Sequence, residues 1–354
     1  MNVCESILGL NPYQGGKPIE ELKRELGLEY VIKLASNENP LGASSNVKQA
    51  INSSLKEIHR YPDGNGYDLK VALSKHLGVD IATISLGNGS NELLELIARV
   101  FVCKSTDEVI FSQYAFVVYP LVTQALGATA KIAPAQEFGH NLDAMLEMIG
   151  DETKLIFIAN PNNPTGTLLT DSEIYDFLSK VPKQIPVVLD QAYYEYLDTI
   201  GQAIDWLNVF DNLIITRTFS KAYGLAGLRV GYSVSKPNIA DYINRVRAPF
   251  NVNHSAQIAA IAALNDVDYL QKSVRSNKEG LKQLEESFKS LNLSYIKSSA
   301  NFIAVEFENA LETYEKLLKE GVIVRPIEIP NFLRITVGTA EENIYLIKAL
   351  KKIL

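Results

Sequence analysis

The residues best suited to chemistry lie in the glycine-rich stretch TFSKAYGLAGLRVGY at positions 218–232. Lys221 stands there directly after Ser220, Arg229 follows eight residues later, and the apolar run NLIIT precedes the stretch. A lysine placed just after a buried strand loses hydration, which lowers the pKa of its amine and lets that amine attack a carbonyl group. Ser220 and Arg229 could bind a phosphate nearby, because guanidinium and phosphate groups form paired, charge-assisted hydrogen bonds.

An aldehyde that carries a phosphate and binds a lysine describes pyridoxal 5'-phosphate (PLP). A Ser-Lys pair after a strand is common, so this interpretation depends on the rest of the chain. Predicted strands at 154–159 and 187–189 are followed by the polar clusters NPNNPTG and DQAYYEY. The second cluster begins with Asp190, and a carboxylate at the end of an apolar strand is costly to desolvate unless it meets a cation. The protonated ring nitrogen of PLP is such a cation.

A third polar cluster, GNGSNE, follows a predicted strand at 81–86 and opens an amphipathic helix. The free amides of Ser90, Asn91 and Glu92 at this helix N-terminus form a possible phosphate site. Ser90 is equally typical of a plain helix cap, so this cluster alone leaves both interpretations open.

Strands and helices alternate along the first two thirds of the chain, which indicates a mostly parallel sheet between helices. Ligands of such sheets bind beyond the carboxyl ends of the strands, where the polar clusters lie. From about residue 251 the pattern changes to long helices and short strands, which favours an α+β unit. We therefore predict an N-terminal arm (1–35), a large α/β domain (36–251) and a small C-terminal domain (252–354).

Composition excludes several classes of protein. The chain has 354 residues, 47% of them hydrophobic and 21% charged, and its net charge of −7 offers no basic surface for nucleic acid. Cys4 and Cys103 fit neither a disulfide framework nor a metal site, and we expect no bound metal. Because we find neither a membrane-spanning apolar run nor a signal peptide, we expect a cytoplasmic protein with no membrane partner.

Seven segments together resemble the fold-type I PLP-dependent aminotransferases, and most closely the histidinol-phosphate branch of that family. In chain order they are SNENPLG, RYPDG, GNGSNE, NPNNPTG, DQAY, TFSKAYGLAGLRVGY and LRITVGT. The resemblance covers nearly the whole chain. It implies a large domain with a mostly parallel seven-stranded sheet between helices, a smaller α+β C-terminal domain, an N-terminal arm and PLP as the cofactor.

The resemblance also implies roles for the residues around the cofactor ring. Lys221 resembles the Schiff-base lysine that later moves a proton at the substrate α-carbon. Asp190 would keep the ring nitrogen protonated, and Asn163 and Tyr193 would hydrogen-bond the 3' oxygen of the ring. Tyr114 would stack on the ring face.

The phosphate site implied by the resemblance involves two subunits. Tyr61 would reach in from a second chain, so we expect a homodimer with shared active sites. The other cofactor-binding residues expected here are Ser90, Asn91, Glu92, Thr218, Ser220 and Arg229.

The substrate site is implied by two arginines. Arg334 resembles the arginine that binds a substrate carboxylate as a bidentate fork, and Arg325 resembles the second arginine of a dual anion site. Tyr13, from the partner's arm, would close over this site, and Asn37 would line it. The segment 327–332 is shorter than in many family members, which puts the shape of this wall in doubt.

The implied reaction is transamination between L-histidinol phosphate and 2-oxoglutarate, which gives imidazole-acetol phosphate and L-glutamate. A threonine-phosphate decarboxylase and a broad aromatic amino-acid aminotransferase share most of these motifs and stay open as alternatives. A PLP-sensing transcription regulator would need an added DNA-binding domain, whereas the cofactor-domain motifs already begin near Asn37. A second departure, Gln191 in place of the commoner glutamate, should be harmless.

Overall fold

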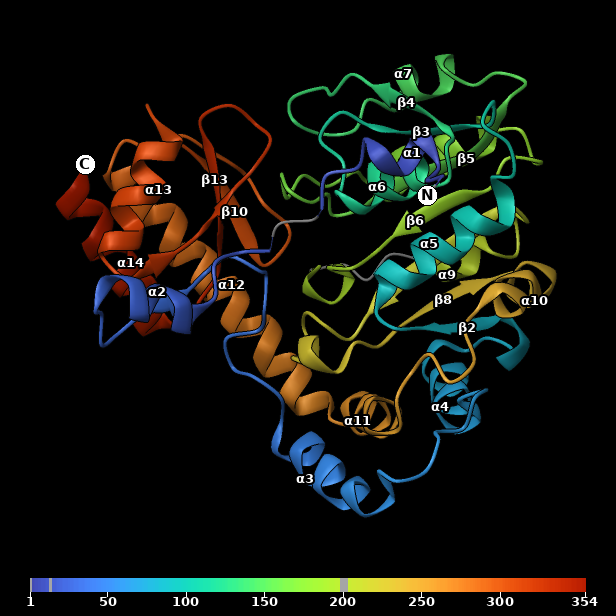
Figure 1. Ribbon diagram of the computed structural model, residues 1–354, viewed down its shortest axis with the longest axis horizontal. Helices are drawn as coiled ribbons and strands as arrows, with labels where there is room; N and C mark the ends of the chain where they lie inside the picture. The colour runs from blue at the N-terminus through green and yellow to red at the C-terminus, as the bar shows by residue number, and fades with distance from the viewer. Residues whose placement is uncertain (1, 13–14, 198–202) are drawn as a thin grey trace.

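A computed structural model describes residues 2–12, 15–197 and 203–354. A large α/β part and a smaller C-terminal part lie side by side, and the long helix α12 (Val267–Ser290) runs between them (Figure 1). This arrangement confirms the predicted fold class.

A seven-stranded sheet forms the centre of the large part, in the order β2-β8-β7-β6-β5-β3-β4. β8 runs antiparallel to β2 and β7, and the other neighbours are parallel, so the expected mostly parallel sheet is confirmed. β8 itself is not among the strands predicted above. The strands are β2 (Ile84–Gly87), β3 (Glu108–Ser112), β4 (Thr129–Ala133), β5 (Thr153–Ala159), β6 (Val187–Asp190), β7 (Leu213–Thr218) and β8 (Gly231–Ser235).

Helices cover both faces of this sheet because successive strand residues point to opposite sides. Val187 and Leu189 pack into one apolar cluster with α3, α4, α7, α8 and α11, whereas Val188 packs into another with α5, α6 and α10. The helices of the large part are α3 (Ser45–Ser54), α4 (Tyr67–Leu77), α5 (Ser90–Phe101), α6 (Val118–Ala125), α7 (Leu142–Glu147), α8 (Asp171–Lys180), α9 (Ala203–Trp206), α10 (Pro237–Val246) and α11 (His254–Leu264).

The smaller part contains an antiparallel sheet in the order β12-β13-β10-β9. One face, with Ile303 and Leu333, packs on α12 and the last helices, while the other face, with Phe302 and Phe332, contacts side chains of the large part. The remaining elements here are β9 (Tyr295–Ile296), β10 (Phe302–Glu306), α13 (Ala310–Lys319), β11 (Val322–Ile323), β12 (Arg325–Pro326), β13 (Phe332–Thr336) and α14 (Ala340–Ile353).

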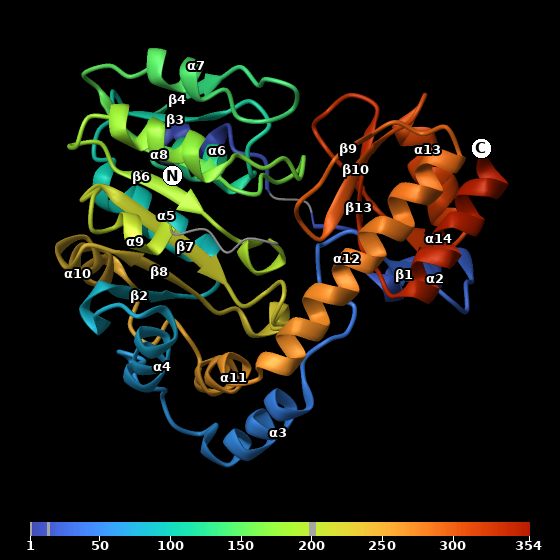
Figure 2. The ribbon, with the colours of Figure 1, turned by 180° about the vertical axis from the view of Figure 1, so that it is seen from behind.

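The beginning of the chain is divided between the two parts, as Figure 2 shows from behind. α1 (Glu5–Leu8) lies against α6, whereas α2 (Ile19–Leu26) packs on the smaller part through Leu22 and Ile323. β1 (Ile32–Lys33) pairs in parallel with β11. No helix among the described residues is long and apolar enough to cross a membrane.

Candidate active site

A cavity of about 950 Å³ lies between the two parts, at the carboxyl ends of β5, β6 and β7. Its position matches the expectation that ligands bind beyond the ends of parallel strands. Twelve residues predicted for the site line it: Asn37, Ser90, Asn91, Asn163, Asp190, Tyr193, Thr218, Ser220, Lys221, Arg229, Arg325 and Arg334. Their binding roles stay predictions.

Lys221 lies in the loop after β7 and is half-buried at the cavity wall. Its Nζ donates to the backbone oxygen of Ser36 at 3.2 Å and lies 5.8 Å from the centre of the Tyr193 ring. Burial, followed by the positive charge of Arg334, lowers the pKa of this amine to about 8, against the opposing effect of Glu38. A useful fraction of the amine is therefore neutral, and nucleophilic, near neutral pH.

Asp190 is the last residue of β6 and is buried at the floor of the cavity. Its two carboxylate oxygens accept hydrogen bonds from Thr216 Oγ1 at 2.9 Å and from Tyr119 Oη at 3.0 Å. Burial raises the pKa of Asp190 to about 6, although both hydrogen bonds and the charge of Lys221 oppose that rise. A desolvated carboxylate held in place by two donors is suited to face a cationic ring nitrogen.

A network of amides and one arginine fixes the Tyr193 hydroxyl. Asn37 and Asn163 each donate to this oxygen through Nδ2, at 2.9 and 3.1 Å. Arg334 Nη1 in turn donates to Asn163 Oδ1 at 2.6 Å, and its Nη2 donates to the Ala35 carbonyl at 2.8 Å. The predicted ring-binding groups and the predicted substrate arginine thus belong to one connected network.

The groups predicted for phosphate binding converge at the start of α5. Arg229 Nη1 donates to Ser220 Oγ at 3.3 Å, and the Ser220 amide donates to Thr218 Oγ1 at 3.1 Å. Gly89 precedes the helix with φ of 77°, and a Cβ there would collide with the Arg229 guanidinium. Helix amides, a hydroxyl and a guanidinium converge here, and this combination of donors fits a phosphate group. The residues present therefore fit PLP.

The comparisons with known proteins agree with this geometry. The pattern of the family described as aminotransferase class I and II matches residues 29–350. The chain belongs to this family. Histidinol-phosphate aminotransferase 1 of Idiomarina loihiensis is 53% identical over 99% of this chain and 97% of its own length. Histidinol-phosphate aminotransferase of Methylobacillus flagellatus is 51% identical over 99% of this chain and 96% of its own length.

Solved structures extend the comparison to the fold of this aminotransferase. Histidinol-phosphate aminotransferase of Sinorhizobium meliloti, crystallised with pyridoxal-5'-phosphate, superposes with a TM-score of 0.91 and 29% identity over 99% of this chain and 96% of that chain. Aspartate aminotransferase of Thermus thermophilus with maleate superposes with a TM-score of 0.85 and 17% identity over 100% of both chains. At this identity the likeness supports a shared fold alone.

Two residues expected at the cofactor do not place their side chains in the cavity of this aminotransferase. The prediction that Tyr114 stacks on the cofactor is wrong for this structure, because its ring packs against Phe138, 6.0 Å away, in a cluster between the two parts. The aromatic side chain of that loop that does line the cavity is Phe116. The Glu92 carboxylate accepts hydrogen bonds from the Asn88 amide and from Asn251 Nδ2, both at 2.6 Å. Only the backbone amide of Glu92, at the start of α5, therefore stays a predicted phosphate-binding group.

The two residues expected from a partner subunit are not tested by one chain. Tyr61 is 83% exposed and stacks on Phe250, with ring centres 4.7 Å apart, outside this cavity. Tyr13 lies outside the described residues. Of the two departures noted in the sequence, Gln191 accepts two hydrogen bonds from Arg217, at 3.0 and 2.8 Å, and is absent from the described lining of the cavity.

Sequence reasoning missed three groups that shape the site. Tyr119 and Thr216 hold the Asp190 carboxylate, and Glu38 lines the cavity and raises the pKa of Lys221. Thr216 could have been found, because it lies directly beside Asp190 where β6 and β7 pair. Tyr119 lies inside a mostly apolar helix segment, where a tyrosine is typical of a core position. Nothing in the sequence therefore indicated that its hydroxyl donates to Asp190.

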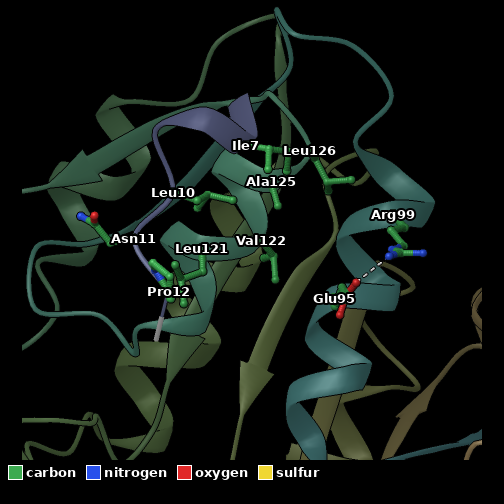
Figure 3. Close-up of a pocket in the computed structure, with 10 residues that line it drawn as sticks. All are labelled: Ile7, Leu10, Asn11, Pro12, Glu95, Arg99, Leu121, Val122, Ala125 and Leu126. Carbon is green, nitrogen blue, oxygen red and sulfur yellow. Dashed lines mark hydrogen bonds and ion pairs between the residues drawn. The ribbon is translucent and has the colours of Figure 1, made fainter. Parts of the chain in front are cut away.

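A second hollow of about 770 Å³ lies between α1, α5 and α6 (Figure 3). Its described lining is mostly apolar, and Glu95 and Arg99, which line it too, form an ion pair with each other at 2.6 Å. It holds no convergent set of acid, base and nucleophile among the described residues, so the cavity at Lys221 is the candidate active site.

Proposed function

We propose that the protein transfers an amino group between L-histidinol phosphate and 2-oxoglutarate, giving imidazole-acetol phosphate and L-glutamate, as a PLP-dependent step of histidine biosynthesis. The proposal rests on the family of the chain and on the names of its relatives. One observation in the structure carries the choice of substrates, which is the position of the two arginines in the smaller part.

Arg325 and Arg334 stand directly opposite each other where β12 and β13 pair, and both line the cavity that holds Lys221. Like charges directly opposite on antiparallel strands repel each other, and an anion bound between the two guanidinium groups would relieve that repulsion. A phosphate ester and the distal carboxylate of 2-oxoglutarate are both suitable anions for guanidinium groups. Such a site serves both substrates of the proposed reaction in turn.

The other residues of the cavity would bind the cofactor and transfer the proton. Thr218, Ser220 and Arg229 would bind the cofactor phosphate, and Asp190 would hold the ring nitrogen protonated. Bound PLP supplies an electron-poor ring that stabilises negative charge at the substrate α-carbon.

Lys221 Nζ would accept the proton that leaves the α-carbon, because its lowered pKa keeps part of the amine neutral at pH 7. The Asn163 and Tyr193 side chains would orient the ring. The arginines would place the α-carbon within reach of Nζ and help to exclude water from the cavity.

The test is an absorbance scan of the purified protein with L-histidinol phosphate alone, without a keto acid. We expect conversion of the bound cofactor to its aminated form, whereas L-threonine phosphate should release no carbon dioxide and phenylalanine or tyrosine should react far more slowly. Lys221→Ala is the control and should show no conversion. Carbon dioxide release from threonine phosphate, without conversion by histidinol phosphate, would assign the protein to the decarboxylases instead.

We further propose a cytoplasmic homodimer in which Tyr61 of each chain completes the phosphate site of the other. The exposed Tyr61–Phe250 pair supports this, because an aromatic pair held outside its own cavity is available to a neighbour. Mixing Lys221→Ala with Tyr61→Ala chains should restore activity, since about a quarter of all sites then have both residues if chains exchange at random. Activity no higher than the sum of the two separate variants would argue against shared sites.

A further inference from the structure

A tight turn at residues 136–139 holds two residues that are not glycine in the left-handed backbone region. Glu137 has φ of 48° and Phe138 has φ of 66°, and the flanking Gln136 and Gly139 exchange two backbone hydrogen bonds, at 3.2 and 2.8 Å. Two-residue turns of this kind normally use asparagine, aspartate or glycine, because other side chains are strained there. Such strain persists where surrounding contacts hold the backbone in place, and it often marks a functional position.

The turn places the ring of Phe138 at the interface between the large part and the smaller part. Its ring centre lies 6.0 Å from that of Tyr114 and 5.4 Å from that of Phe332, both within the range of favourable aromatic pairs. Phe138 and Tyr114 come from the large part, whereas Phe332 begins β13 of the smaller part. The same cluster includes Ile296, Ala304, Ile327, Ile329 and Phe332, all from the smaller part.

The turn is fixed to the edge of the active-site cavity on its other side. His140 is buried, and its Nε2 donates to the carbonyl of Ala159, the last residue of β5, at 2.8 Å. The amide of Ala135 donates to Gln113 Oε1 at 3.2 Å. Ala159 and Gln113 both line the cavity. The residues on either side of the turn that carries Phe138 are therefore hydrogen-bonded to residues that line the cavity.

Phe332 connects this cluster to the anion site. Arg334 follows it by two residues on β13, so the two side chains leave the same face of the strand, and Arg325 stands opposite Arg334. The short segment that joins the arginines contributes Ile329 to the cluster. A shift of this segment would displace the backbone of the two strands that carry the arginines.

We propose that Phe138 is a positioning residue for the substrate anion site. Its ring, together with that of Tyr114, clamps the start of β13 and so keeps Arg325 and Arg334 facing the cavity. The short segment between the arginines depends on this external contact. The inference rests on the proposed function only in taking the bound anion to be that of the substrate.

Phe138→Ala is the first test. We expect the KM for histidinol phosphate and for 2-oxoglutarate to rise about tenfold, which corresponds to about 1.4 kcal/mol, because a displaced guanidinium group loses hydrogen bonds to the substrate anion. The kcat should change less than about threefold, and the absorbance of the bound cofactor should change little, because Asp190 is held by Tyr119 and Thr216, which lie outside the Phe138 cluster. A fall in kcat without a change in KM would overturn the proposal.

Two further variants keep the test decisive. Phe138→Leu keeps apolar volume and should restore most of the affinity, and, if the alanine variant does not fold, it should still raise KM about twofold to threefold. Tyr242→Ala removes an exposed ring on α10, away from the cavity, and should change neither constant. A KM within the error of the unmodified enzyme in both Phe138 variants would refute the positioning role.

The same assay separates this inference from the proposed function. Turnover of histidinol phosphate by the unmodified enzyme reports on the function. The ratio of KM values for 2-oxoglutarate, variant over unmodified enzyme, reports on Phe138 whichever amine serves as the donor.

Discussion

Replacing Tyr119 with phenylalanine isolates the group that holds the Asp190 carboxylate. The Tyr119 ring stacks on Phe157 with centres 4.5 Å apart and planes 2° from parallel, and it meets Phe116 edge-on at 5.9 Å. Phenylalanine preserves both ring contacts. The change therefore removes only the hydroxyl that donates to Asp190 Oδ2 at 3.0 Å.

The size of the effect follows from the ionisation of Asp190. Burial raises the pKa of this carboxyl to about 6, and the Tyr119 hydrogen bond is one of the contacts that limit the rise. A hydrogen bond to a charged group contributes about 1.5–3 kcal/mol, and one pH unit corresponds to about 1.36 kcal/mol. We expect the titration of Asp190 to move upward by about one to two pH units in Tyr119→Phe. At pH 7 the unmodified carboxyl is about 90% ionised, and the variant about half or less.

The assay is titration of the apoprotein with PLP between pH 5.5 and 8.5, followed by absorbance. The ring nitrogen requires an ionised partner, so the Kd of the unmodified protein should rise as the pH falls through about 6. In Tyr119→Phe the Kd for PLP should begin to rise at a pH that is higher by about one unit or more, and kcat/KM should fall over the same pH range.

Thr216→Val removes the other donor and should act in the same direction, whereas Tyr223→Phe removes a buried hydroxyl that does not contact Asp190 and should change nothing. Superimposable pH profiles for Tyr119→Phe and the unmodified protein would refute the reasoning.

Two other substitutions test the site from different sides. Gly89→Ala should weaken PLP binding by tenfold or more on the same titration, because φ of 77° is strained for alanine and its Cβ meets Arg229. Gly227→Ala, where the Cβ would meet open space, is its matched control, and equal losses in both would contradict the explanation. Asp190→Asn should stabilise the apoprotein against urea by up to about 3 kcal/mol at pH 7–8. The raised pKa means that the native carboxyl favours folding below pH 4 and loses that advantage as the pH rises through about 6. A stability difference that does not vary with pH would count against this assignment.

Residues directly after buried strands were predictable from the sequence. Asp190 and Lys221 follow runs of apolar residues, and parallel strands bring their carboxyl ends to one edge, so their meeting in one cavity follows from the topology. The capping box of Thr339 and Glu342 at the start of α14 is equally local, because its two residues lie only three positions apart in the sequence.

Side-chain direction in loops was not predictable, because it depends on contacts far away in the chain. Tyr114 and Phe116 are two residues apart in one loop, and packing against Phe138 and Phe332 turns the first away from the cavity. The strand β8 was missed for a related reason. Three of its five residues, GYSVS, are glycine or serine, which do not favour a strand, and all five are buried between two neighbouring strands.

The pairing of β1 with β11 has a consequence for how the protein forms on the ribosome. Ile32 pairs with Val322, and the Leu34 carbonyl accepts from the amide of Thr336, so the smaller sheet region needs both ends of the chain. At about 5–20 residues per second, the N-terminal strand waits on the order of tens of seconds for its partner. Lys221 and Asp190 emerge well before Arg334. The nascent chain is therefore expected to complete its cofactor-binding half first and to acquire substrate binding only after β13 has emerged.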